Sequence, residues 1–355
     1  MKKILDFLNK LFIDGLSGMA LGLFATLIVG TILSQIGTYI PGMVGDCFVL
    51  VGKIASLAMG AGIGAGVAVK YKESPLVTLS AAVTGLVGAY ASQILAGTVL
   101  TEGIMTVRAP GEPLGAFVAA FVGIELGHLI SGKTKLDILL TPLVTIISGS
   151  LAGLLIGPPI SEFMSWLGSI INWATEQQPV IMGIVIAVLM GMFLTLPISS
   201  AAIGVSLGLS GIAAGAAVVG CCANMIGFAV ISYRDNKVGG LLSQGLGTSM
   251  LQMPNIVRKP IIWIPPIVAS AILGPIATTV LKIVGSPVGS GMGTAGLVGP
   301  ITSYAEMVNA GDPVWFVLIK LILMCFVFPA LLSYAVYEPM YRARWIKKGD
   351  MKLDV

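Results

Sequence analysis

The residues that could do chemistry in this chain are mostly uncharged, and they lie where two apolar stretches are interrupted. One interruption is 195–200 (TLPISS), where Pro197 lacks a backbone donor and local unwinding would free carbonyls and amides for a ligand. The other is Val238 to Val257, which is rich in Gly, hydroxyl and amide residues and contains Pro254. Asn224 adds an amide within a further apolar run.

Hydroxyl and amide side chains can match the hydroxyl groups of a desolvated sugar, each of which needs a donor and an acceptor. We therefore predict a site for a small neutral polar solute, most simply a carbohydrate. The predicted ligand-binding residues are Thr195, Ser199, Ser200, Asn224, Gln244, Thr248, Ser249, Gln252 and Asn255. The alternative for each residue is that it satisfies exposed backbone at a helix break.

Ionisable residues offer few candidates for catalysis. Glu125 and His128 lie one helical turn apart, and His128 is the only histidine. It would be the sole imidazole for a proton or phosphoryl relay, but the Ser-Gly-Lys turn at 131–133 favours an interfacial position. The four cysteines lie in apolar runs without ligand spacing and are interpreted as small apolar fillers. We predict no catalytic residue, no metal and no cofactor.

The composition indicates a polytopic membrane protein. Of 355 residues, 56% are hydrophobic and 10% are charged, whereas soluble domains carry about 25% charged residues. The net charge of +4 gives no reason to expect a nucleic-acid partner, and we expect none. Crossing the bilayer takes about 20 apolar residues. Runs of that order lie near 13–36, 47–69, 76–99, 114–130, 138–158, 180–232, 260–283 and 314–337.

Basic residues in short loops predict the orientation, because such loops stay on the cytoplasmic side. They place both termini inside, and Arg108 is the one cation expected outside. The number of crossings is then even, so the block 180–232 crosses once or three times, giving eight or ten in total. We favour an all-α protein of about ten transmembrane helices with re-entrant hairpins.

The segment Val238 to Val257 is the clearest candidate for a re-entrant hairpin. Arg234 and Lys237 precede it, and Arg258 and Lys259 follow it, so both of its ends are expected on the same side. Its polar interior would suit a lipid-facing helix poorly. Irregular backbone at membrane depth is tolerated where it is buried in protein or lines a cavity.

An amphipathic segment divides the chain. Ser161 to Gln178 places apolar residues at helical spacing, with Trp166 and Trp173 positioned for a helix lying in the interface. The predicted organisation has a scaffold half and a substrate half. Its segments are a transmembrane half at 1–159, the interfacial helix at 160–179, a second transmembrane half with re-entrant segments at 180–341, and a basic cytoplasmic tail at 342–355.

The run from Leu140 to Pro159, which contains Ile-Gly-Pro, resembles the membrane IIC component of the bacterial phosphotransferase system, glucose superfamily. The resemblance covers most of the chain in layout, and it implies a sugar permease of the bacterial inner membrane. The family's signature glutamate has no acidic counterpart here, because Met250 occupies the nearest position, and 195–200 contains no histidine. No stretch resembles a IIA or IIB domain, so we expect a stand-alone member.

Three functions stay open at this point. The chain could be a permease coupled to phosphorylation by a separate cytoplasmic IIB-type protein, which would supply the phosphoryl chemistry. It could transport a solute without phosphorylation. It could also be a membrane sensor or regulator that kept the fold. In each case the partners we expect are the lipid bilayer and a second copy of the chain in a homodimer.

Overall fold

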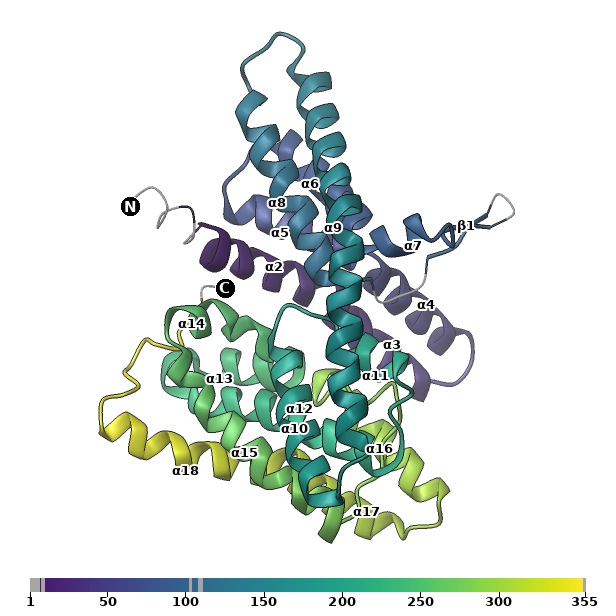
Figure 1. The fold of residues 1–355 in the computed structure, drawn as a ribbon, viewed down its shortest axis with the longest axis vertical. Coiled ribbons are helices and arrows are strands. Elements are labelled where there is room, and N and C mark those ends of the chain that lie inside the picture. Colours follow the sequence, from purple (N-terminus) through teal and green to yellow (C-terminus); the bar gives the residue numbers. More distant parts are fainter. Residues whose placement is uncertain (1–6, 8–9, 102–103, 108–110, 354–355) are drawn as a thin grey trace. The chain divides into compact units, whose positions relative to one another are not determined.

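The computed structural model describes residues 7, 10–101, 104–107 and 111–353, and these residues are mostly helical (Figure 1). In these ranges the only strands are β1 (Leu100–Thr101) and β2 (Ile104–Met105), a short antiparallel pair. The chain forms two compact units, Met1–Met164 and Ser165–Val355, with the boundary inside helix α9 (Asp137–Thr175). Arg108, which the sequence places on the outer side, lies outside the described residues.

The first unit is a set of apolar helices packed through small residues. Helix α6 begins after Ser74, whose hydroxyl accepts from the backbone N–H of Val77, and Pro75 occupies its first turn. Helix α5 packs against α2 and α6. The helices are α2 (Leu16–Leu23), α3 (Val29–Tyr39), α4 (Met43–Leu57), α5 (Met59–Lys70), α6 (Pro75–Ala89), α7 (Ala91–Leu95), α8 (Pro113–Ile130) and the first part of α9; Lys10–Gly15 and Phe24–Ile28 are π-helical.

The second unit is built around α12 (Gly211–Ile231), which packs against α10, α15 and α18 (Figure 1). The other helices are α10 (Pro179–Thr195), α11 (Ser200–Ser206), α13 (Tyr233–Leu242), α14 (Met253–Arg258), α15 (Ile264–Pro275), α16 (Val298–Asn309), α17 (Val314–Ile322) and α18 (Phe328–Arg342). Short π-helical segments lie at Ser243–Gly247, Ile276–Val280 and Leu323–Val327, and 3₁₀ turns lie at Ser249–Gln252, Pro260–Trp263 and Ala295–Leu297.

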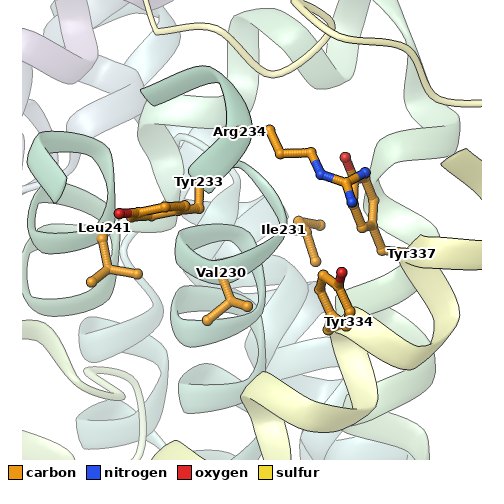
Figure 2. Close-up of a pocket in the computed structure, with 7 residues that line it drawn as sticks. All are labelled: Val230, Ile231, Tyr233, Arg234, Leu241, Tyr334 and Tyr337. Carbon is orange, nitrogen blue, oxygen red and sulfur yellow. The ribbon is translucent and has the colours of Figure 1, made fainter. Parts of the chain in front are cut away.

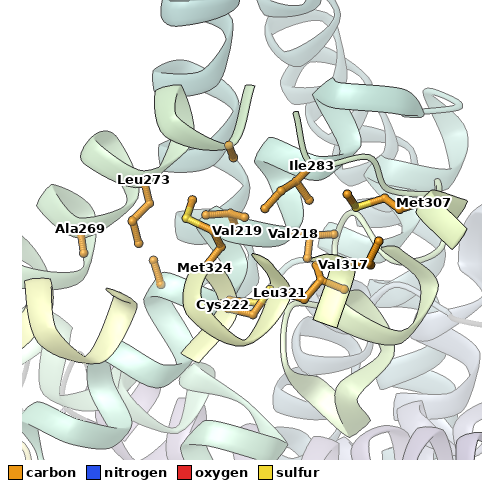
Figure 3. Packing of buried hydrophobic residues seen from close by; sticks show 13 residues of the cluster. Val218, Val219, Cys222, Ala269, Leu273, Ile283, Met307, Val317, Leu321 and Met324 are labelled. Carbon is orange, nitrogen blue, oxygen red and sulfur yellow. The ribbon is translucent and has the colours of Figure 1, made fainter. Parts of the chain in front are cut away.

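The core of the second unit forms on one side of α12. Figure 3 shows Val218, Val219 and Cys222 of α12 packed with Leu273 of α15 and Met324 of the Leu323–Val327 segment. Three of the four cysteines are buried and free, as apolar fillers should be, whereas Cys47 is exposed. This packing places α12 at the centre of the unit, in contact with α10, α15 and α18.

Among the described residues, fewer helices are long and apolar enough to cross a membrane than the ten that the sequence suggests. There are six such helices, and the pair α4 and α5, bent by 55°, raises the number to seven if it forms one span. Ten crossings are therefore not confirmed, because α6 and α10 fall below 18 residues and α11 has only 7. The block 180–232 is divided by breaks at Pro197, Gly208 and Gly211. The two glycines have positive φ.

The segment predicted to lie in the interface continues the preceding helix. Helix α9 runs from Asp137 to Thr175 with Pro158 and Pro159 inside it. Its last turns are amphipathic, since Leu167, Ile171 and Ala174 are buried while Trp166 and Trp173 are exposed. The in-plane position of this segment stays a prediction.

Glycines allow α10, α12 and α15 to approach one another closely. A Cβ atom added at Gly220 would lie 1.9 Å from the backbone oxygen of Ala187, and one added at Gly191 would lie 2.5 Å from the oxygen of Gly220. Gly183 and Gly274 meet in the same way between α10 and α15. The close approach brings polar groups on these helices within hydrogen-bonding range.

We expect Gly220→Ala to destabilise the protein by about 1–3 kcal/mol, because α10 and α12 must separate to make room for the methyl group. Thermal unfolding of the detergent-purified chain measures this loss. Gly239→Ala is the matched control, since a Cβ at Gly239 meets nothing within 4 Å. Equal unfolding temperatures for the two variants would contradict this account of the packing.

Candidate functional site

Two backbone breaks and one buried amide meet in the second unit. Helix α10 ends at Thr195 because Leu196, which precedes Pro197, is extended. The predicted hairpin is broken at the extended Thr248, and Ser249 follows it. The hydroxyls of Thr195 and Ser249 lie 2.8 Å apart, and the Thr195 hydroxyl also lies 3.4 Å from Oδ1 of Asn224. All three side chains are buried.

Asn224 is the residue that connects this group. Its Nδ2 donates to the backbone oxygen of Gly220 and to Oγ of Ser270, both at 3.2 Å. Its Oδ1 accepts from Nε1 of Trp263 at 3.0 Å. We call Thr195, Asn224, Ser249, Trp263 and Ser270 the central polar group. An amide that both donates and accepts suits either this network or a hydroxylated ligand that replaces part of it.

Trp263 and Ser270 were not among the predicted site residues. Ser270 is a hydroxyl residue within the apolar run 260–283, which is the signal that could have identified it. Its hydroxyl also donates to the backbone oxygen of Pro266 at 2.9 Å, one turn earlier in the same segment. Hydroxyls inside helices commonly make this bond, so the residue type alone does not identify a site residue. Trp263 lies just after the basic residues 258–259, where an interfacial aromatic residue is expected.

The other predicted amides form a second group. Nε2 of Gln252 donates to Oε1 of Gln244 at 2.9 Å, and Nδ2 of Asn255 donates to Oε1 of Gln252 at 2.9 Å. Nε2 of Gln244 continues the chain by donating to Oγ of Ser232 at 2.8 Å. All three amides are buried. We call Gln244, Gln252 and Asn255 the amide chain.

The amide chain binds the carboxyl-terminal tail of the protein. Gln252 donates to the backbone oxygen of Met351 at 3.0 Å, and Asn255 donates to that of Lys352 at 2.9 Å. Asn236 adds a bond to the same Met351 oxygen at 2.7 Å and accepts from the N–H of Leu353. The tail is thus folded onto the hairpin, and sequence reasoning missed this role of the amides.

The remaining predicted residues have local roles in this conformation. Ser200 donates to the backbone oxygen of Gly291 at 2.7 Å and thereby ties the first break to the glycine-rich stretch 285–303. Thr248 accepts from the N–H of Met250 at 3.1 Å and caps the 3₁₀ turn that follows. Ser199 is buried beside the break. These contacts are those of hydroxyls that satisfy backbone at helix breaks.

The ionisable residues of the first unit form a separate cluster. Glu125 is paired with Lys10, and Nδ1 of His128 lies 2.9 Å from Oε2 of Glu73. The His128 side chain is 63% exposed. Tyr71 donates to the backbone oxygen of Lys10, and burial, with the nearby Glu125 and Asp14 carboxylates, raises the pKa of Tyr71 well above its ordinary value. In the described ranges, no three His, Cys, Asp or Glu side chains are grouped as a metal site.

Comparison with known protein families gives a match over most of the chain. A family model described as "Phosphotransferase system, EIIC" matches residues 13–353, which is nearly the whole chain. The match includes the central polar group, the amide chain and the folded tail up to Leu353. No curated protein matches the chain.

We expect Gln252→Ala to loosen the tail, because it removes the bonds to Gln244 and Met351 and one of the two acceptors of Asn255. Only the Met351 bond joins Gln252 to the tail directly, so we expect the closed tail to lose about 1–2 kcal/mol of stability and trypsin to cleave it roughly 5- to 30-fold faster. Gln177→Ala is the control, since the Gln177 amide donates to the Trp173 oxygen at the end of its own helix and not to the tail residues 343–353 that the structure describes. Unchanged cleavage in Gln252→Ala would show that the amide chain does not hold the tail.

Proposed function

The chain belongs to the phosphotransferase-system EIIC family, and from that premise we propose that it moves a small neutral polar solute, a carbohydrate, across the membrane. The family and the apolar helices make it a multi-pass membrane protein with a permease-type fold. The observation that carries the choice of solute is the hydroxyl pair of Thr195 and Ser249, joined to the Asn224 amide at two backbone breaks.

The central polar group has the chemistry needed to exchange one set of hydrogen bonds for another. Its members are uncharged, so a neutral solute can displace the Thr195–Ser249 bond without burying an unpaired ion. Each displaced hydroxyl would find a sugar hydroxyl as its new partner, which keeps the net change in hydrogen-bond free energy small. A charged solute would find no counter-ion among these five side chains.

The nine predicted residues take distinct roles in this proposal. Thr195, Asn224 and Ser249 contact the solute directly, while Ser199, Ser200 and Thr248 hold the two breaks open to it. Gln244, Gln252 and Asn255 set the position of the hairpin by binding the tail. The hairpin itself, which the broken backbone at Thr248 divides into two short arms, is proposed to be re-entrant.

The wider arrangement follows from the loop charges and the family. We place the protein in the bacterial inner membrane as a homodimer, with both termini cytoplasmic. Residues 1–159 form the scaffold half, 160–179 an interfacial helix, 180–341 the substrate half and 342–355 the tail. The central polar group contains no carboxylate or imidazole, so phosphoryl transfer to the sugar is assigned to a separate cytoplasmic IIB-type protein.

Solute binding can be measured through Trp263, because its indole N–H bonds the Asn224 amide. We expect a neutral sugar from a panel of hexoses, N-acetylhexosamines and disaccharides to change the tryptophan fluorescence of the purified chain. Asn224→Ala and Ser249→Ala should each weaken that binding by roughly 5- to 150-fold, since a lost partner costs about 1–3 kcal/mol. Trp263→Phe should abolish the signal.

Ser169→Ala is the matched control, because the Ser169 hydroxyl donates to the Trp166 oxygen in its own helix and Ser169 is not part of the central polar group. His128→Ala should also leave binding unchanged, since this residue belongs to the separate cluster in the first unit. The proposal fails if the central substitutions leave sugar binding intact while His128→Ala abolishes it.

The proposed orientation is tested by labelling one introduced cysteine at a time in intact cells on a Cys47→Ser background, in which the three remaining cysteines are buried. Lys348→Cys should react with a membrane-impermeant maleimide only after permeabilisation, whereas Glu176→Cys should react at once. Both side chains are exposed in the structure, so membrane sidedness decides the outcome. Immediate labelling at position 348 would overturn the assignment of a cytoplasmic tail.

A further inference from the structure

A strongly basic pocket lies at the end of α18 in the second unit. Its volume is about 640 Å³, and five cations and a single carboxylate contribute to its wall. The lining residues are Arg234, Glu338, Tyr341, Arg342, Arg344, Ile346, Lys347 and Lys348. An excess of guanidinium and ammonium groups in one concavity is the chemistry that binds a phosphate.

The folded tail holds the wall of this pocket in place. Ile346 and Met351 are buried in a core that includes Phe228 and Tyr337, so the basic residues between them are not part of a free chain end. Asp350 accepts from the N–H of Lys347 at 2.6 Å and forms an ion pair with Lys259. Because Lys259 balances the negative charge of Asp350, this carboxylate does not reduce the positive charge of the pocket.

The backbone conformation at Arg344 also indicates that this part of the pocket wall has a fixed structure. Its φ is +61°, in the left-handed region that a non-glycine residue seldom occupies. Hydrogen bonds from the N–H of Arg344 to the Tyr341 oxygen and from that of Trp345 to the Met340 oxygen hold this turn after α18. Such a conformation persists only where the surrounding structure fixes it.

Arg234 has an incompletely satisfied guanidinium. Its Nη2 donates to Oε2 of Glu338 at 3.0 Å, and its Cζ lies 4.4 Å from the ring centre of Tyr341. Its Nη1 is buried and has no hydrogen-bond partner within the described part of the chain. A buried donor without an acceptor is costly, and a ligand oxygen would satisfy it.

Arg234 also lines a second, apolar pocket of about 270 Å³ (Figure 2). The other lining residues are Val230, Ile231, Tyr233, Leu241, Tyr334 and Tyr337. Figure 2 shows the Arg234 side chain beside Tyr337, with Ile231 of α12 next to both and Leu241 of α13 farther to the left. A basic pocket and an apolar pocket that share one arginine match a ligand with an anionic head and a hydrocarbon tail.

We propose that these two pockets bind one anionic phospholipid, with its phosphate in the basic pocket and part of an acyl chain in the apolar pocket. Arg234 contacts the phosphate from the shared wall, and Arg342, Arg344, Lys347 and Lys348 neutralise it. Trp345, which is 59% exposed beside the pocket, lies where aromatic side chains meet lipid headgroups. None of the residues that line these two pockets belongs to the central polar group, so this proposal does not rest on the proposed solute site.

The test uses the full chain purified in dodecyl maltoside and titrated with dioctanoylphosphatidylglycerol, with binding followed by native mass spectrometry. Dioctanoylglycerol, which has the same chains without the phosphate, is the comparison lipid. Arg342→Gln/Lys347→Gln should weaken phosphatidylglycerol binding by at least about tenfold, because each cation near an anionic headgroup contributes a severalfold gain. Lys133→Gln/Lys135→Gln removes two exposed cations of the first unit and should leave binding unchanged.

Two further measurements separate a lipid site from other sources of the same signal. Val230→Phe, which fills the apolar pocket, should weaken phosphatidylglycerol binding while the unfolding temperature stays within a few degrees of wild type. If Arg342→Gln/Lys347→Gln and Lys133→Gln/Lys135→Gln weakened phosphatidylglycerol binding equally, the lipid would be attracted by surface charge in general, and the proposal would be overturned. Stabilisation by inorganic phosphate as strong as that by phosphatidylglycerol, at matched ionic strength, would overturn the lipid assignment in favour of a soluble phosphate ester.

Discussion

A polar group buried among apolar helices must be hydrogen-bonded, and the second unit depends on how Asn224 meets this constraint. Its amide satisfies Ser270 and Trp263 and reaches Thr195 beside the first backbone break. Glycines in α10, α12 and α15 make these bonds possible, because larger residues would hold the helices apart. The breaks at Pro197 and Thr248 are tolerated because the hydroxyls beside them, those of Thr195 and Ser249, are hydrogen-bonded within the protein.

The same constraint explains the folded tail. Two buried amides of the hairpin, Gln252 and Asn255, donate to the backbone carbonyls of Met351 and Lys352 in the tail. Asp235 accepts from the N–H groups of Gly349 and Met351 in return. Hairpin and tail therefore form one cooperative structure, so a change that opens one is expected to loosen the other.

Apolar periodicity predicts helices well but not their polar partners. The runs 114–130, 260–283 and 314–337 correspond to candidate spans Pro113–Ile130, Pro260–Val280 and Val314–Arg342, because apolarity alone sets those lengths. The contacts of Thr195 with Asn224 and Ser249 join residues 29 and 54 positions apart, which no local pattern encodes. Thr195 and Ser249 were predicted from their polarity at breaks and Asn224 from its amide within an apolar run, whereas the tail partners of Gln252 and Asn255 were not predicted.

The central claim is that a neutral sugar is bound by the hydroxyls at the two breaks and the Asn224 amide. An experimental structure of the full chain in lipid nanodiscs, with the tightest-binding sugar of a panel at saturating concentration, tests it most directly. The account predicts sugar density within hydrogen-bonding distance of Thr195, Asn224 and Ser249, with the Thr195–Ser249 bond replaced by bonds to the sugar. An intact Thr195–Ser249 bond, with the sugar bound elsewhere, would contradict it.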